Sequence, residues 1–357
     1  MSSLLAHGLG TDPVEPDWPP LTDTEVTDIV GPARVVWRSP RPLSAAAVVE
    51  RSDPDRRIFV KRHHTSVRTL EGLAEEHAFL RHLRLRGAPV VEVLDLATRG
   101  EWTYEVHSAG VGIDLYRDAL SWSPFRSPAH ARAAGEALAR LHLAAEGFDA
   151  PRRQVQPLVA SFTVFASPDP LTELERYVEE RPQLAKGLAD FPWREDTQRT
   201  LLPLHETLAP HLPDLDPLWT HNDWHASNLL WNKDGSVATA LDFGMSDRTT
   251  AVHDLATAIE RNTVQWLQPG FPVRDADAVA LLDGYQSLRP LTPAESKALP
   301  ALLPLVHAEF ALSELGYFHG VTRSPENTRL AYEYYVGHAE WFSGESGQRL
   351  LDLVRRH

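Results

Sequence analysis

The chain carries HNDWHASNLL at residues 221–230, ALDFG at 240–244 and HDLA at 253–256. This stretch places Asp223 and Asn228 in one loop and Asp242 at the end of an apolar run. Phosphoryl transfer needs a carboxylate that orients the attacking hydroxyl and oxygen ligands that hold Mg²⁺ on a triphosphate. The spacing therefore predicts Asp223 as the catalytic carboxylate, with Asn228 and Asp242 as ligands of the metal.

The order His-x-Asp-x4-Asn and then Asp-Phe-Gly resembles the protein-kinase-like fold. The details are more similar to the aminoglycoside phosphotransferase and choline kinase superfamily, although Asn222 replaces its usual glycine. A further family-like piece is Gly135-x2-Leu138-x2-Leu141-His142. The resemblance spans about residues 25–340 and implies an α+β, bilobal fold. A small antiparallel-sheet lobe with one helix comes first, and a larger, mainly helical lobe follows.

Hydrophobic periodicity predicts the same order of elements. Residues 1–20 are polar and proline-rich, which indicates a flexible leader. Residues 21–107 form the expected nucleotide-binding lobe, and 108–357 form the helical lobe with the catalytic loop and the acceptor site. The expected strands are 33–38, 45–50, 57–62, 89–96 and 102–107, with a turn at 52–55. The expected helices are 22–30, 69–86, 129–146, 171–180, 198–208, 251–265, 275–287, 294–319 and 324–354.

Composition narrows the class of protein. Of 357 residues, 43% are hydrophobic, which is enough for a substantial core, and the formal net charge is −14. An acidic balance argues against nucleic-acid and anionic-membrane partners, which select basic surfaces. Cysteine is absent, which excludes disulfides and fits a reducing compartment, so a cytoplasmic location is expected. The sequence contains no run of about eighteen apolar residues, so no membrane span is expected.

Lysine is rare, with four in the chain, and Lys61 ends the apolar strand Ile58-Phe59-Val60. The resemblance implies that Lys61 binds the α and β phosphates. On a helix over 69–86, a turn of about 100° per residue puts Glu76 on the inward face between Leu83 and Leu80. A carboxylate there needs a cation, so we predict a Lys61–Glu76 ion pair. The alternatives are a solvated strand end for Lys61 and a solvated edge for Glu76.

Two further segments are expected to contact the nucleotide. The first hairpin, residues 37–44, has no glycine to cover the phosphates, and its prolines lack N–H donors. The hydroxyls of Ser39 and Ser44 are the candidates there. Where the superfamily links its lobes, backbone groups from Glu105 to His107 would meet the base.

Other polar residues of the motifs have structural interpretations. The resemblance implies that His221 packs and hydrogen-bonds in the catalytic loop, and that Asp254 supports this loop. N-capping of a helix is the alternative for Asp254. His221, Asp223 and His225 also spell a hydrolytic metal motif, but without further ligands at a recognisable spacing. Most of the other histidines lie singly on predicted helices, and none is assigned to a metal.

These residues predict an ATP-dependent O-phosphotransferase, with GTP possible as donor and Mg²⁺ as the metal. The acceptor would be a hydroxyl-bearing small molecule, and the acidic balance favours one that contains an amine. An antibiotic such as an aminoglycoside is one class; the alternatives are choline, homoserine, sugars or peptide Ser/Thr side chains. A nucleotide-binding scaffold without transfer activity, a pseudokinase, is a further hypothesis motivated by the glycine-free hairpin.

Carboxylates near the catalytic loop and on the 294–319 helix are the candidates that would bind an amine. For each of them, an ordinary solvated helix surface is the alternative. The candidate acceptor residues are Asp247, Glu260, Glu309, Glu314 and Tyr317, with His319 beside them.

Overall fold

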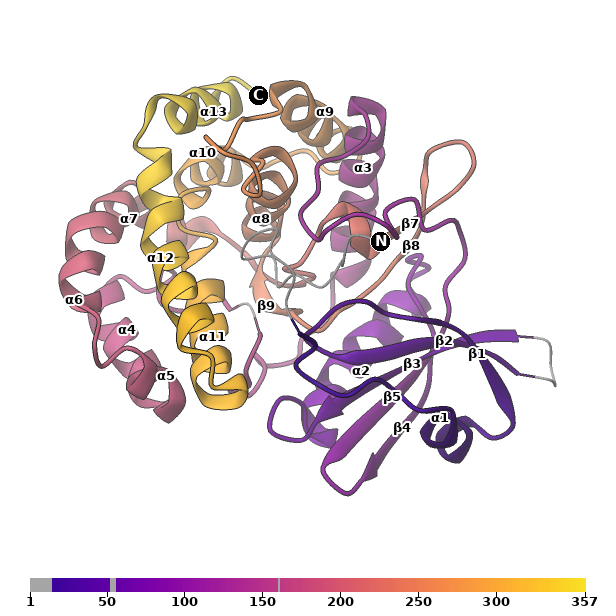
Figure 1. Cartoon of the computed structure of the whole chain (residues 1–357). Coiled ribbons are helices and arrows are strands. Elements are labelled where there is room, and N and C mark those ends of the chain that lie inside the picture. The colour runs from indigo at the N-terminus through magenta and orange to yellow at the C-terminus, as the bar shows by residue number, and fades with distance from the viewer. Residues whose placement is uncertain (1–14, 52–55, 160) are drawn as a thin grey trace. The chain divides into compact units, whose positions relative to one another are not determined.

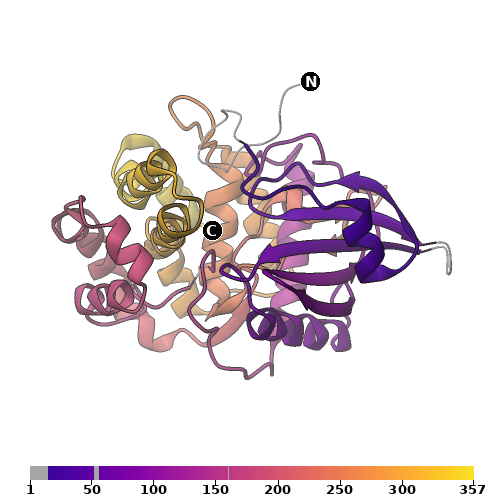
Figure 2. The same ribbon diagram turned by 60° about the horizontal axis from the view of Figure 1, so that its bottom comes forward.

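The computed structural model describes residues 15–51, 56–159 and 161–357. The chain divides into two compact units. Unit 1 comprises the described residues up to Ser121 together with Ser227–Leu241, and unit 2 comprises those of Trp122–Ala226 and Asp242–His357. Figures 1 and 2 show the elements of each unit from two directions. The first fourteen residues of the expected leader and the expected turn at 52–55 lie outside the described residues.

Unit 1 is built on a five-stranded antiparallel sheet in the order β1-β2-β3-β5-β4 (Figure 1). The sheet and its helices confirm the predicted α+β small lobe. The strands are β1 (Ala33–Arg38), β2 (Ala45–Arg51), β3 (Arg56–His64), β4 (Val93–Arg99) and β5 (Trp102–Ser108). The helices are α1 (Asp23–Val30) and α2 (Leu70–Leu85), and a hairpin of β7 (Leu229–Trp231) and β8 (Val237–Ala240) joins the unit later in the chain.

The two faces of this sheet differ in chemistry because side chains alternate along each strand. One face buries Val49, Val60 and Val106 with Val26 of α1 in a single apolar cluster. The neighbouring positions of β3 and β5 point to the other face, and there His77 of α2 contacts β5. The helix α2 therefore covers a face whose strands carry polar side chains.

Residues 109–121 belong to unit 1, so the division falls at Ser121 rather than at the expected residue 108. Ile113 and Trp231 exchange two backbone hydrogen bonds, of 2.8 and 3.0 Å. Gly112 has a φ of 121°, and a Cβ at this position would lie 2.8 Å from the Cβ of Ala238. The segment is held against the β7–β8 hairpin, which explains why both lie in the same unit.

The described end of the expected flexible leader packs on the sheet. The N–H of Asp17 donates to the carbonyl of Pro42, and the Trp18 indole donates to the carbonyl of Leu43. The Trp18 ring also stacks on His64 at a centroid distance of 5.0 Å. Residues 17 and 18 are thus ordered by unit 1.

Unit 2 is mainly helical, as predicted, and among the described residues no helix is long and apolar enough to cross a membrane. A short sheet pairs β6 (Pro217–Thr220) with β9 (Asp247–Thr250). In both views α11 and α12 run side by side. The α-helices are α3 (Pro128–Ala145), α4 (Pro170–Glu179), α5 (Pro182–Gly187), α6 (Trp193–Asp196), α7 (Leu202–Leu208), α8 (Ala251–Thr263), α9 (Asp275–Gln286), α10 (Pro293–Leu302), α11 (Ala308–Tyr317), α12 (Pro325–Phe342) and α13 (Glu345–Arg355). Shorter helical turns are η1 (Thr197–Leu201), η2 (Ala209–Asp214), η3 (Ala226–Asn228) and η4 (Phe318–Thr322).

Two of the long predicted helices are interrupted. The one over 294–319 breaks after Leu302 and resumes at Ala308. Pro304 lies in the break, and a proline cannot donate the helical hydrogen bond that continuation requires. The one over 324–354 breaks at Ser343-Gly344, where glycine disfavours a continuous helix.

Helices α3 and α9 cross at glycines. A Cβ on Gly135 would collide with the carbonyl oxygen of Leu281 and lie 2.9 Å from the backbone nitrogen of Tyr285. A Cβ on Gly284 would meet the backbone of Arg132 in the same way. The crossing therefore requires glycine at both positions, and it brings α3 close enough to act on the site described below.

We expect Gly135→Ala to destabilise the protein by about 1–3 kcal/mol, because the added methyl must push two backbones apart. Urea unfolding measures the change. The matched control is Gly337→Ala in α12, where a Cβ meets nothing within 4 Å. It should be neutral or stabilise by up to about 1 kcal/mol. Equal stability of the two variants would show that the crossing is not tightly packed.

Candidate functional site

The loop between β6 and β7 is held by a buried carboxylate. Asp254 of α8 accepts the N–H of His221 at 2.9 Å and the N–H of Asn222 at 2.8 Å. Its second contact is His142 of α3, whose Nε2 lies 3.0 Å away. Thr250, rather than Asp254, caps α8, so the N-capping interpretation of Asp254 is wrong. The residue instead fixes the backbone of the loop.

The network behind Asp254 is fully buried. His142 extends it, because its Nδ1 lies 2.7 Å from the hydroxyl of Tyr285. Burial alone would raise the pKa of Asp254. The interactions with His142 and with the loop lower the pKa by a larger amount, so its net value lies below 3.8. Burial also lowers the pKa of His142 below its usual value. Asp254 is thus an ionised acceptor at neutral pH.

Asn222, which departs from the glycine of the family pattern, takes the conformation that glycine favours. Its φ is 60°, a left-handed value that asparagine tolerates better than most residues. The side-chain carbonyl accepts the hydroxyls of Thr220 at 2.9 Å and Thr249 at 3.3 Å. Its amide donates to the carbonyl of Met245. Asparagine therefore preserves the turn and adds side-chain bonds that glycine lacks.

His221 is buried and has a local role. Its Nδ1 accepts the N–H of Asp223 at 3.1 Å. Its ring meets Phe243 edge-on at 4.6 Å and Trp224 at 5.4 Å. The His221 ring therefore contacts both the catalytic loop, through Trp224, and the Asp-Phe-Gly segment, through Phe243.

Asp223 is a partly exposed carboxylate among positive groups, with 13% of its side chain accessible. It forms an ion pair with Arg261 of α8, and His225 Nε2 lies 3.5 Å from the same oxygen. Burial raises the pKa of Asp223, but the charges of His225 and Arg261 lower it, and the net pKa falls well below 3.8. Asp223 is therefore ionised across the physiological range.

Arg261 was not predicted from the sequence. It lies seven residues after Asp254, two helical turns on, so both side chains share one face of α8. Its guanidinium stacks over Phe310 at 4.5 Å and lies 5.3 Å from the Trp122 ring. The available signal was this seven-residue spacing from Asp254 on a predicted helix that begins next to the motif.

The two predicted metal ligands belong to different units. Asp242 in unit 2 is exposed and has a φ of 55°, while the following Phe243 is buried. Asn228 in unit 1 is buried, and its carbonyl accepts the N–H of Leu241 at 2.8 Å. A left-handed backbone conformation is unfavourable for a non-glycine residue such as Asp242, so the surrounding structure must hold its backbone in place. Their joint role as metal ligands stays a prediction.

Lys61 lies on β3 and Glu76 on α2, both in unit 1. Glu76 is buried on α2, as its predicted face requires, whereas Leu70 on that predicted face is 40% exposed. The pKa of His107 lies above its usual value. Burial and the charge of Lys61 lower this pKa, but the charges of Glu105 and Glu76 raise it by more. Both side chains therefore act on His107, and their ion pair stays a prediction.

The expected backbone contacts of Glu105 and His107 with a nucleotide base do not fit the structure. β5 is an interior strand, and Glu105 pairs with Lys61 on one side and Leu96 on the other. Backbone groups between two neighbouring strands are used by the sheet. The side chains of both residues are buried.

The first hairpin orders its serine locally. The Ser39 N–H donates to the carbonyl of Ala46, and its hydroxyl accepts the N–H of Arg41 at 3.2 Å. Ser39 and Ser44 are both half-buried. Their contact with phosphates stays a prediction.

Two of the acceptor candidates serve the backbone of unit 2. Asp247 accepts the N–H groups of Arg153 and Arg248, each at 2.8 Å, and burial raises its pKa to about 6. Glu309 accepts the N–H groups of Thr163 and Val164, each at 2.9 Å. These bonds tie loops to β9 and α11, so we leave both residues out of the acceptor site proposed below.

The remaining acceptor candidates are also buried, so the solvated-surface interpretation is wrong for them; His319 is half-buried. Glu260 lies 2.8 Å from Nδ1 of His338, and Tyr317 is fully buried. Burial raises the pKa of Glu314 to about 8, while the charge of Arg261 lowers it and that of Asp223 raises it. Glu314 is thus close to the Asp223–Arg261 pair.

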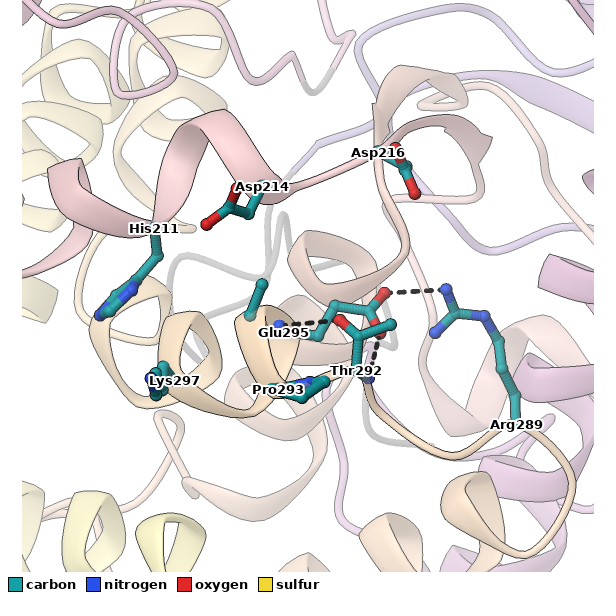
Figure 3. Close-up of a pocket in the computed structure, with 9 residues that line it drawn as sticks. His211, Asp214, Asp216, Arg289, Thr292, Pro293, Glu295 and Lys297 are labelled. Atoms are coloured by element: carbon teal, nitrogen blue, oxygen red, sulfur yellow. Dashed lines mark hydrogen bonds and ion pairs between the residues drawn. The ribbon is translucent and has the colours of Figure 1, made fainter.

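A separate pocket in unit 2 lies at the start of α10 (Figure 3). Arg289 pairs with Glu295 at 2.8 Å, and Glu295 and Thr292 form a reciprocal cap on the helix. The pocket is lined by His211, Asp214, Asp216, Arg289, Thr292, Pro293, Ala294, Glu295 and Lys297. None of the predicted site residues lines it, and its central charges stabilise α10.

The sheet unit, the helical unit and the loop held by Asp254 define a protein-kinase-like fold. The model of the phosphotransferase enzyme family matches residues 40–291, and the chain belongs to this family.

Individual relatives are more distant. A homoserine kinase of Caulobacter vibrioides is 30% identical over 196 residues, 52% of this chain and 53% of that protein. An uncharacterized protein of Deinococcus radiodurans is 29% identical over 257 residues, 69% of this chain and 67% of that protein. The chain spans about half the length of the homoserine kinases that it matches. A crystal structure of aminoglycoside-3'-phosphotransferase of type VIII shares 19% identity with a TM-score of 0.49, covering 78% of this chain and 93% of that one.

The pKa of Glu314 predicts a pH-dependent stability. Its value is about 8 in the folded protein and near 4.5 in the unfolded chain, so the folded state holds the extra proton between these values. The free energy of unfolding should therefore fall as pH rises through this window. Urea unfolding between pH 6 and 9 should show a shallower fall for Glu314→Gln, and at pH 9 this variant should exceed the wild type by at least about 1 kcal/mol. The exposed Glu333→Gln should keep the wild-type slope; identical slopes for all three proteins would contradict the assignment.

Proposed function

We propose that the protein is an ATP-dependent O-phosphotransferase that phosphorylates the hydroxyl of a small molecule. The observation that supports this most directly is Asp223, an ionised carboxylate at the surface of a loop whose backbone Asp254 holds. The acceptor oxygen would bond to the γ-phosphorus while the bond from that phosphorus to the ADP oxygen breaks. The hydroxyl proton would pass to Asp223.

The low pKa of Asp223 defines its part in this reaction. A carboxylate of low basicity removes a proton late, after the bond to the leaving group has weakened. Its earlier task would be to orient the hydroxyl. Arg261 keeps the carboxylate ionised and in place, so we assign it a positioning role.

Nucleotide binding would draw on four of the predicted residues. Lys61, positioned by Glu76, would bind the α and β phosphates. Asn228 and Asp242 offer the amide and carboxylate oxygens that Mg²⁺ prefers, and Mg²⁺ would neutralise charge on the triphosphate. Asp242 is exposed, so its carboxylate is accessible to a Mg·ATP complex that binds from solution. ATP is the proposed donor, and GTP is a test condition.

The acceptor would be a small alcohol that bears an amine, such as an amino acid. Glu314 supports this class, because among the described residues its Oε2 is buried without a hydrogen-bond partner. An ammonium group beside Glu314 would favour loss of the proton that burial retains there, pair with the resulting carboxylate and place a nearby hydroxyl at Asp223. The homoserine kinase relatives support an amino-acid acceptor over an antibiotic.

Asp223→Asn should lower kcat by a factor on the order of 10²–10⁴, because the amide cannot accept the proton. The affinity for Mg·ATP should stay within about twofold, since the substitution leaves the nucleotide residues intact. ADP release is the assay, with homoserine, choline, aminoglycosides and Ser/Thr peptides as acceptors and Mg·GTP as second donor. Asp352→Asn, at an exposed acid of α13, is the control. Full activity of Asp223→Asn would refute the assignment, and tight nucleotide binding with no turnover in any protein would favour the scaffold.

Asp242→Asn should instead weaken Mg·ATP binding by tenfold or more, because one anionic ligand becomes neutral. Nucleotide affinity is measured by calorimetry with and without Mg²⁺. The expected loss appears only with Mg²⁺ present. An unchanged affinity in both conditions would remove Asp242 from the metal site.

A further inference from the structure

Three histidines and a glutamate meet between α2 and the sheet of unit 1. His63 comes from β3, His77 from α2, and Glu105 and His107 from β5. All four are buried, with exposures of 8%, 1%, 2% and 8% in that order. They share the polar face of the sheet, because His63 and Lys61, like Glu105 and His107, are alternate residues of one strand. We call these four residues the histidine–glutamate cluster.

Three atoms of the cluster form a nearly equilateral triangle. His77 Nε2 lies 3.0 Å from Oε2 of Glu105, and His107 Nε2 lies 3.2 Å from the same oxygen. The two nitrogens are 3.2 Å apart. The rings meet at an interplanar angle of 67°, so their Nε2 atoms converge from different directions.

Hydrogen bonding alone gives a poor account of this triangle. Two donors to one carboxylate oxygen normally follow separate lone pairs and lie well apart, by about 5 Å. Ligands of a tetrahedral ion at about 2.0–2.1 Å are instead about 3.3 Å from one another. The observed separations match one face of such a tetrahedron.

The surroundings also fit a metal site. His63 Nε2 lies 2.9 Å from the other oxygen, Oε1, of Glu105 and fixes the orientation of the carboxylate. Ligating carboxylates are commonly held by outer hydrogen bonds of this kind. Two imidazoles and one carboxylate are a ligand set that binds zinc and leaves one coordination position open.

A second group of this type, in unit 2, has less suitable geometry. His338 Nδ1 lies 2.8 Å from Glu260, but His307 Nδ1 lies 3.6 Å away. The two rings are tilted by 35° with centroids 3.8 Å apart, so they stack rather than point at a common centre. Its histidines are as buried as those of unit 1, which makes them a matched control.

We propose that His77, Glu105 and His107 bind one divalent transition-metal ion of the zinc class, with His63 orienting the carboxylate. The ion would join α2 to β5 and stabilise unit 1, because binding to a site that exists only in the folded state adds to folding free energy. This site is separate from the Mg²⁺ ligands proposed above and does not depend on the proposed activity.

The test uses the full chain, stripped with a chelator and titrated with Co²⁺ and Zn²⁺ in excess Mg²⁺. The wild type should bind one equivalent, give the intense visible bands of tetrahedral Co²⁺, and unfold at a higher temperature with Zn²⁺. His77→Gln and His107→Gln should each lose the bands and weaken binding by at least tenfold. His338→Gln should keep both.

Several results would overturn the proposal. One is that the wild type binds no stoichiometric Co²⁺, which would mean that the cluster holds protons only. Another is that the Co²⁺ site is lost in His338→Gln but kept in His77→Gln. If the His77 and His107 variants fail to fold, His338→Gln decides alone: retention of one tetrahedral Co²⁺ supports the site in unit 1, and its loss refutes it.

Discussion

The hydrogen bonds that Asp254 accepts from His221 and Asn222 determine the geometry on which the candidate site depends. A buried carboxylate is tolerated because the donors around it offset the cost of its desolvation. His142 ties the same carboxylate to α3, and the glycine crossing lets α3 approach α9. The position of Asp223 is therefore determined by Asp254, a residue that need not touch any reactant.

Local backbone strain is concentrated on either side of this support. Asn222 and Asp242 both have left-handed φ values, each of which costs on the order of 1 kcal/mol outside glycine. For Asn222 the bonds to Thr220 and Met245 offset the cost. Asp242 precedes Phe243, whose buried ring packs on His221. The same histidine thus steadies both strained positions, which explains why it is buried rather than offered to solvent.

The sequence predicted features that depend on local pattern and missed those that depend on tertiary pairing. Helical periodicity placed Glu76 inward, and the motif spacing identified the loop around Asp223. The bond between Glu309 and Thr163 joins residues far apart in the chain, and no spacing rule connects them. The same is true of the addition of residues 227–241 to unit 1. Helical periodicity could have identified Arg261, since it shares a helix face with Asp254, but the role of one charged residue on a helix with several polar side chains is ambiguous until its partner is known.

Buried carboxylates in this protein are repeatedly paired with histidine. Asp254 contacts His142, Glu105 contacts three histidines and Glu260 contacts His338. The chain has four lysines and seventeen histidines, so this choice follows its composition. A neutral imidazole can donate a hydrogen bond to a carboxylate without bringing a second charge into the core, which avoids part of the desolvation cost of a lysine ion pair. It also leaves a ring nitrogen that can bind another group. Where several imidazoles converge on one oxygen, as at Glu105, the arrangement that neutralises a buried acid is therefore also one that can bind a metal ion.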